Sequence, residues 1–183
     1  MNKKEFITSV VFFILLVVLY ALFPVKDKFQ NILTALIFFT ILPIFYVKYI
    51  LKKDIKYLGL IIGNIKKGLF YGTISFFIVF SIFYIIIKYT KFLNNYALPK
   101  DIYTNFLSFL FYELTLVLLI VIIYEFFFRG FILFTLEKRL KAWAILAQVV
   151  LFFLLILFIG GLKWALLPYL VFAPFGGIIT VGY

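Results

Sequence analysis

The sequence predicts an all-α protein, a polytopic bundle of about six transmembrane helices. Of its 183 residues 67% are hydrophobic, and the mean hydropathy is +1.21. Soluble domains are roughly half apolar, and a soluble core of this length cannot hide such a surplus from water. The apolar residues also occur in runs of about 20, the length at which a helix crosses the hydrocarbon of a bilayer.

Six apolar runs are candidates for spans, and Pro43 in the second is tolerated in a membrane helix as a kink. These runs are Phe6–Phe23, Ile32–Ile50, Gly68–Ile87, Phe106–Phe128, Ala142–Ile159 and Trp164–Tyr183. A further apolar stretch, Tyr57–Ile62, is too short to cross and is expected to lie in the interface. Neither a repeat nor a linker interrupts the pattern, so residues 1–183 are expected to form a single membrane domain.

The basic residues predict how the chain is oriented in the membrane. Lys and Arg number 18 and Asp and Glu number 7, for a net charge of +11. The basic residues occupy short segments between apolar runs, which favours contact with lipid headgroups and argues against nucleic acid as a partner. If the N-terminus is inside, twelve lie on the inner side and six on the outer side. The inner set is Lys3, Lys4, Lys48, Lys52, Lys53, Lys56, Lys66, Lys67, Arg129, Lys138, Arg139 and Lys141, and the outer set is Lys26, Lys28, Lys88, Lys91, Lys100 and Lys163. This bias predicts a protein of the cell membrane with both termini in the cytoplasm.

Several kinds of chemistry are excluded because the chain has neither cysteine nor histidine. Disulfides and thiolate catalysis both require cysteine. Histidine is the commonest metal ligand and the commonest proton shuttle. The sequence therefore predicts neither a metal site nor a cofactor.

Charged residues within a span are costly, so they mark a function or a paired contact. The fourth span holds Glu113 and Glu125, which a regular α-helix places about 120° apart, on different faces. Glu125 and Arg129 are four residues apart and share a face. The sequence allows either a structural pair at the inner end of the span or a polar cluster aimed into the bundle. Glu113 is expected to bond to a Tyr or Thr of a neighbouring helix.

The run from Tyr124 to Gly130 resembles the first motif of the CPBP family of membrane proteases. That family includes the type II CAAX prenyl endopeptidases and proteins of bacteriocin self-immunity. The motif is Glu-Glu-x-x-x-Arg, with an aromatic residue before the Arg and a Gly after it. Glu125, Phe128, Arg129 and Gly130 match it, whereas Tyr124 occupies the position of the first glutamate.

The resemblance extends over residues 106–183. The second family motif, Phe-x-x-x-His, has its Phe at Phe152 and its His position at Ile156. The final His-x-x-x-Asn segment is expected beyond Tyr183. The family uses the first glutamate and two histidines to activate a water molecule, and a tyrosine, with a reference pKa near 10, is no carboxylate base.

The resemblance therefore implies a relative that has lost catalysis and binds a membrane peptide or partner helix. Glu125 and Arg129 are the remnant of its catalytic motif, and Tyr124 and Glu113 are candidate binding residues. Two alternatives stay open: an active endopeptidase completed by missing residues or a partner, and a small transporter or scaffold. In the transporter, Glu113 and Glu125 would form an ion path, but no inverted repeat supports it.

Overall fold

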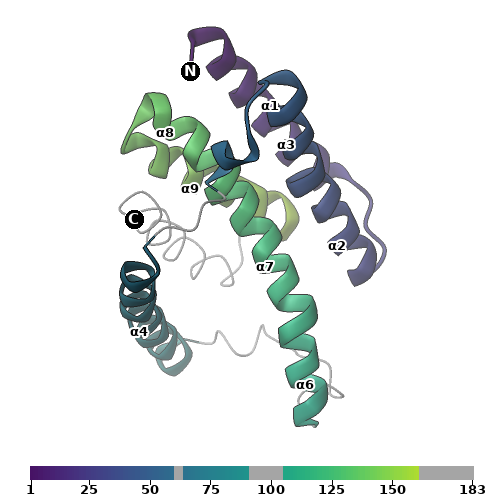
Figure 1. Ribbon diagram of the computed structural model, residues 1–183. Coiled ribbons are helices and arrows are strands. Elements are labelled where there is room, and N and C mark those ends of the chain that lie inside the picture. Colours follow the sequence, from purple (N-terminus) through teal and green to yellow (C-terminus); the bar gives the residue numbers. More distant parts are fainter. Residues whose placement is uncertain (60–63, 91–104, 161–183) are drawn as a thin grey trace.

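The chain is helical throughout the part that the computed structural model describes, namely residues 1–59, 64–90 and 105–160 (Figure 1). The prediction of an all-α fold is confirmed for these ranges. The sixth predicted span, Trp164–Tyr183, and most of the loop before the fourth span lie outside them.

The first half of the chain forms a helical hairpin followed by a separate helix. Helix α1 (Lys3–Leu22) is followed by an unbroken helical run that ends at Ile50, then by a short turn and by α4. The run after α1 consists of α2 (Lys28–Leu36), η1 (Ile37–Ile41), α3 (Leu42–Phe45) and η2 (Tyr46–Ile50). The turn is η3 (Ile55–Leu58), a 3-10 helix, and α4 covers Ile65–Tyr89.

The second half contains one very long helix and a shorter one that returns beside it. The long helix consists of α6 (Phe106–Tyr112), η5 (Glu113–Val117), α7 (Leu118–Glu125), η6 (Phe126–Leu133) and α8 (Phe134–Leu140), and the returning helix is α9 (Trp143–Gly160). The segments η1, η2, η5 and η6 are π-helical.

Among the described residues, four helices are long and apolar enough to cross a membrane: Lys3–Leu22, Phe29–Ile50, Ile65–Tyr89 and Phe106–Leu140. They correspond to the first four predicted spans. The fifth, α9, is apolar but shorter. The count of six therefore stays a prediction.

Polar N-caps at the breaks between apolar runs explain where the helices begin. The Asn2 side chain accepts a hydrogen bond from the Glu5 backbone N–H at 2.7 Å, and the Asn2 N–H donates to the Glu5 carboxylate at 3.2 Å. Asp27 caps α2, and Asn64 caps α4, in the same way. Such caps satisfy N–H groups that have no partner inside the helix.

The fourth helix does not end at Phe128, as the sequence analysis expected, but continues to Leu140. Its 35 residues extend for about 52 Å, more than the thickness of the hydrocarbon core. The predicted boundary was wrong because Arg129 was taken as the end of the apolar run. The apolar pattern resumes after it, and Phe131, Ile132 and Leu133 are all buried.

Pro43 does not break the second helix, because π-helical turns lie on both sides of it. Proline lacks an N–H and cannot make the usual i→i−4 bond. The Leu42 N–H bonds instead to the Ile37 carbonyl, and the Leu51 N–H to the Tyr46 carbonyl at 3.0 Å. These wider bonds keep the backbone paired around the proline, as a helix in lipid requires.

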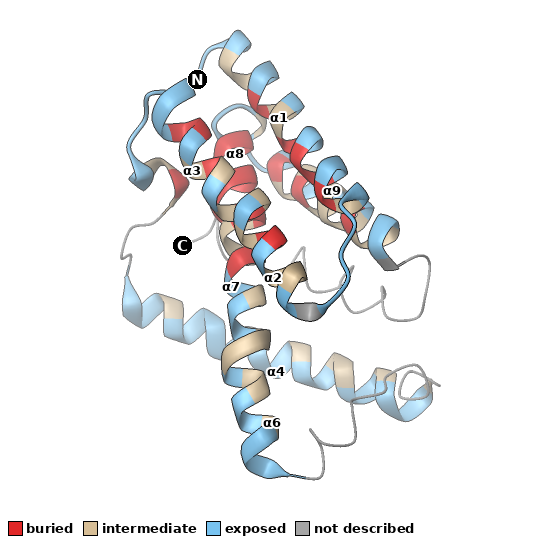
Figure 2. Cartoon of the chain, turned by 90° about the vertical axis from the view of Figure 1, so that its right-hand side faces the viewer, coloured by how far each residue is buried: buried red, intermediate tan, exposed pale blue. Residues whose placement is uncertain are grey.

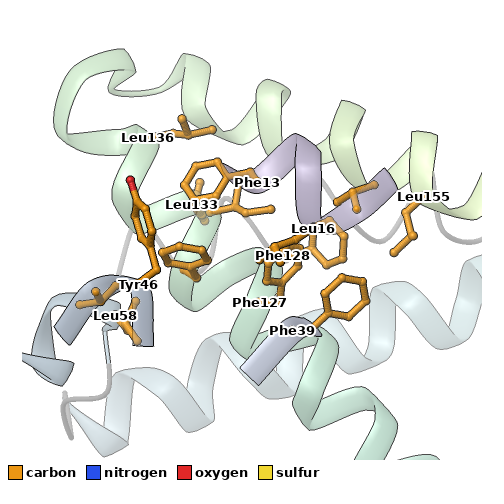
Figure 3. Packing of buried hydrophobic residues seen from close by; sticks show 14 of the residues in the cluster. Phe13, Leu16, Phe39, Tyr46, Leu58, Phe127, Phe128, Leu133, Leu136 and Leu155 are labelled. Carbon is orange, nitrogen blue, oxygen red and sulfur yellow. The ribbon is translucent and has the colours of Figure 1, made fainter. Parts of the chain in front are cut away.

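Buried residues gather where α1, α7, α8 and α9 pack together (Figure 2). Seven of the 19 buried hydrophobic residues in the described ranges are aromatic, and several of their rings pack against one another (Figure 3). Phe39 stacks on Phe127 with ring centroids 4.4 Å apart, and Phe13 meets Phe131 edge to face at 4.8 Å. All four side chains are fully buried. They come from α1, η1 and η6, and α9 packs against α1 and η6. The core thus joins the hairpin to the second half of the chain.

Of the three glycines with described surroundings, Gly59 and Gly72 differ sharply in environment. Gly59 ends η3 with φ +74°, and an added Cβ would meet the ring of Phe134. Gly72 lies inside α4, a helix without buried residues, and nothing approaches within 4 Å of the position of a Cβ. Gly59 therefore occupies a bend that a residue with a side chain would strain. Leu58 beside it is buried, so the turn packs against the protein.

Replacing Gly59 by alanine should destabilise the protein by about 2 kcal/mol or more, because a left-handed conformation and a ring contact both oppose a Cβ. Gly72→Ala is the matched control and should be neutral or stabilise by up to about 1 kcal/mol, from helix propensity. Thermal unfolding of the two variants in detergent measures the difference. Equal melting temperatures would show that the bend at Gly59 is dispensable.

Candidate functional site

Tyr124, one of the binding residues predicted from the sequence, lies at the junction of several helices. Its ring is 5.4 Å from that of Phe39 and 6.4 Å from that of Phe152, measured between centroids. Its hydroxyl oxygen lies 3.1 Å from the hydroxyl oxygen of Tyr20 on α1. The side chain therefore holds α7 against η1, α9 and α1.

A hydrogen-bonded chain runs from Tyr124 through Tyr20 to Asn31. The Tyr20 hydroxyl donates to the Asn31 Oδ1 at 2.8 Å. Since a phenol has one proton, Tyr20 accepts the proton of Tyr124 in the 3.1 Å contact. The hydrogen-bonded chain joins α7, α1 and α2.

The sequence analysis singled out Tyr124 but missed Tyr20 and Asn31. Tyrosine is common near the ends of membrane helices, where it lies at the headgroup level. The position of Tyr20 near such an end therefore gave no reason to expect a hydrogen-bond partner. Asn31 lies one position before the second apolar run. A polar residue so close to an apolar run was the only sign in the sequence. Its hydrogen-bond partner, Tyr20, lies on another helix and could not be identified from the local pattern.

Glu125 and Arg129 form an ion pair across one turn of the helix. The spacing predicted the pairing, but not its surroundings. The side chains remain 43% and 29% exposed, respectively, so neither is buried in the aromatic core. The core-facing residues of this stretch are Ile123, Phe127 and Phe128. The pair lies well inside the helix and not at its end, because that helix continues to Leu140.

Glu113 takes no part in this arrangement. It is half-buried at the start of η5, and the structure shows no hydrogen bond from its side chain to another described residue, so the expected Tyr or Thr partner is not found. Twelve residues of helix place it roughly 18 Å from Glu125 along the axis. The predicted angle of 120° between them assumed a regular α-helix and does not hold through the π-helical segment.

The segments that resemble the two family motifs lie side by side. Phe152 on α9 meets Phe128 edge to face, with centroids 4.8 Å apart, and also contacts Tyr124. Ile156, at the position of the motif histidine, follows one turn later on the same helix. Residues about 25 positions apart in sequence are therefore neighbours in the fold.

A groove of about 500 Å³ lies beside the hydrogen-bonded chain. It forms where α1 ends, α2 begins and α9 ends. Both polar and apolar side chains line it: Tyr20, Ala21, Phe23, Val25, Lys26, Asp27, Asn31, Phe158 and Ile159. Tyr20 and Asn31 thus belong both to the chain that ends at Tyr124 and to the wall of the groove.

No protein-family model, curated protein or solved structure matches this chain. Within the described ranges, no three Asp or Glu side chains gather in a way that would hold a metal ion. The site is therefore defined by its own geometry: a hydrogen-bonded tyrosine, an ion pair and a groove.

Removing one member of the ion pair should destabilise the protein more than removing both, because a single charge is left without its partner. We expect Glu125→Ala and Arg129→Ala each to lower the melting temperature in lipid nanodiscs, and the double variant to recover part of the loss. The cost of a single substitution is expected to be about 1–3 kcal/mol, since both side chains are partly exposed. Equal stability of all three variants would show that the pair contributes nothing.

Proposed function

We propose that this chain is a multi-pass membrane protein with the helical arrangement of the CPBP endopeptidases, that it has lost catalysis, and that it binds a membrane peptide or a partner helix. The observation that carries the proposal is the role of Tyr124. At the position where the family places its first glutamate, this chain has a phenol that is hydrogen-bonded to Tyr20 and packed among phenylalanines.

The chemistry of the neighbouring residues supports a protein without hydrolytic activity. Activating a water molecule needs a placed base or a metal with about three protein ligands. Glu125 is held by Arg129, and the position of the motif histidine is Ile156. At the positions that the family uses for catalysis, this chain has an apolar residue (Ile156), an aromatic residue (Tyr124) and a glutamate in an ion pair (Glu125).

The groove between α1, α2 and α9 is the binding surface in this proposal. Phe158 and Ile159 on its rim are 63% and 53% exposed, respectively, and offer apolar contact area. Asn31 and Lys26 supply hydrogen-bond donors in the same groove. This combination suits an apolar peptide, or the end of a helix, that carries a backbone carbonyl or another acceptor.

The proposed topology has six spans, with both termini in the cytoplasm. The ends of α1, η2 and α8 that carry most of the inner basic residues lie toward the same end of the bundle (Figure 1). Contacts between Arg139 and Phe6, and between Lys138 and Tyr57, link these segments. That clustering supports the orientation that the two-to-one bias predicts.

Cysteine labelling in intact cells tests this orientation. The natural chain has no cysteine, so one introduced thiol is the only target. A thiol at Lys88→Cys, after the third span, should react with a membrane-impermeant maleimide, and one at Lys53→Cys should react only after permeabilisation. The reverse pattern would invert the topology.

Photo-crosslinking tests the binding function. A benzoylphenylalanine at Phe158, on the rim of the groove, should give a discrete protein adduct in native membranes. The same probe at Phe111, which is 70% exposed on α6, serves as the control and should label lipid only. An Asn31→Leu substitution should reduce the Phe158 adduct, because it removes the polar group of the groove. Equal labelling at both positions would contradict a specific partner.

The purified chain should not cleave a prenylated or membrane-bound peptide, with or without added zinc. The double variant Tyr124→Glu, Ile156→His should also remain inactive, because the second histidine of the family is still missing. Turnover of a labelled peptide by the unmodified chain, abolished by Glu125→Gln, would overturn the proposal and favour an active endopeptidase.

A further inference from the structure

One end of the bundle gathers basic side chains from three parts of the chain: the start of α1, the segment around η3, and the turn from α8 to α9. We call this surface the basic end; its basic residues are Lys3, Lys4, Lys48, Lys52, Lys53, Lys56, Lys138, Arg139 and Lys141. All nine side chains are exposed. The acidic residues in the same segments are Glu5, Asp54 and Glu137.

Two of the three carboxylates of the basic end are engaged with the backbone. Glu5 accepts from the Asn2 N–H in the capping box of α1. Asp54 accepts from the Lys56 N–H at 2.8 Å and caps η3. In the whole described part of the chain the one salt bridge is that of Glu125 and Arg129, so no lysine of the basic end has a carboxylate partner within 4 Å there.

The fold brings these positive charges together although charges of the same sign repel one another. Lys53 lies close enough to Lys138 for their charges to repel. The Lys138 Nζ lies over the Tyr57 ring, 2.8 Å from its centroid, and Arg139 lies over the Phe6 ring at 5.0 Å. Cation–π contacts hold both heads in place without neutralising their charge.

The backbone conformation also sets the basic end apart from the rest of the described chain. Within the described ranges, two residues other than glycine have positive φ: Lys52 at 52° and Lys141 at 51°. Both belong to the basic end, one in each of its two turns. A side chain in this conformation costs about 1 kcal/mol or more and persists where the surroundings require it.

Tyr57 anchors the same place. Its hydroxyl donates to the Met1 sulfur at 3.5 Å, and burial raises the pKa of that hydroxyl above its usual value. The exposed ammonium and guanidinium groups around it are groups that recognise phosphate oxygens.

We propose that the basic end is a binding site for the headgroup of an anionic phospholipid. Its ligand is a phosphodiester of the leaflet that faces this end, held by Lys53, Lys138 and Arg139. Its basic residues lie beside the ends of apolar helices, at the level where lipid headgroups are found. This site is separate from the groove, which lies at the other end of α1, and does not depend on the binding function proposed there.

A lipid titration of the detergent-solubilised protein tests the proposal. Phosphatidylglycerol should raise the melting temperature with a saturable dependence, and phosphatidylcholine should not. Each basic group near an anionic lipid contributes roughly a fivefold change in affinity. The variant Lys53→Gln, Lys138→Gln, Arg139→Gln should therefore shift the phosphatidylglycerol midpoint on the order of a hundredfold. Inorganic phosphate should fail to compete.

The matched control removes the same charge from α4, in the variant Lys66→Gln, Lys67→Gln, Lys88→Gln. It should keep the midpoint of the unmodified protein. An equal loss in both variants would overturn the proposal in favour of diffuse charge attraction, and competition by inorganic phosphate would assign the site to a free anion. Far-UV circular dichroism of both variants confirms that the helices remain, and a native mass spectrum that retains phosphatidylglycerol gives a second measure of binding.

Discussion

The stack of Phe39 on Phe127 is the contact on which the rest of the structure depends. It joins the helical hairpin of the first half to the long helix of the second half, and both rings are fully buried. Apolar burial alone does not distinguish protein from lipid tails in a bilayer, so helices there associate through close packing and hydrogen bonds. Interlocked rings provide the packing, and Tyr124 extends the same cluster to α1 through a hydrogen bond.

The second requirement is that polar groups inside the bundle find partners. Pro43 is accommodated because the flanking π-helical turns shift the backbone bonds by one residue. Tyr20, Tyr124 and Asn31 satisfy one another across three helices. The one proton of Tyr124 is thus committed to a bond that joins two helices.

The two ends of α1 have different surroundings. A helix of 20 residues extends for about 30 Å, so the basic end at its start and the groove at its finish are separated by the length of a membrane span. One end presents cations without acidic partners, and the other presents a mixed groove beside a hydrogen-bonded tyrosine. The two proposed binding surfaces therefore lie at opposite ends of the same helix.

Composition and periodicity by themselves determined the helical class and the first four spans, because the length of an apolar run reports the thickness of the layer that it crosses. The sequence also predicted the pairing of Glu125 with Arg129, because residues four positions apart share a face of any α-helix. Tertiary structure alone decided which helices Tyr124 joins, and that Tyr20 and Asn31 complete its hydrogen-bonded chain. Those features depend on partners distant in sequence. A local sequence pattern does not show which distant side chain will pack or form a hydrogen bond at a given residue.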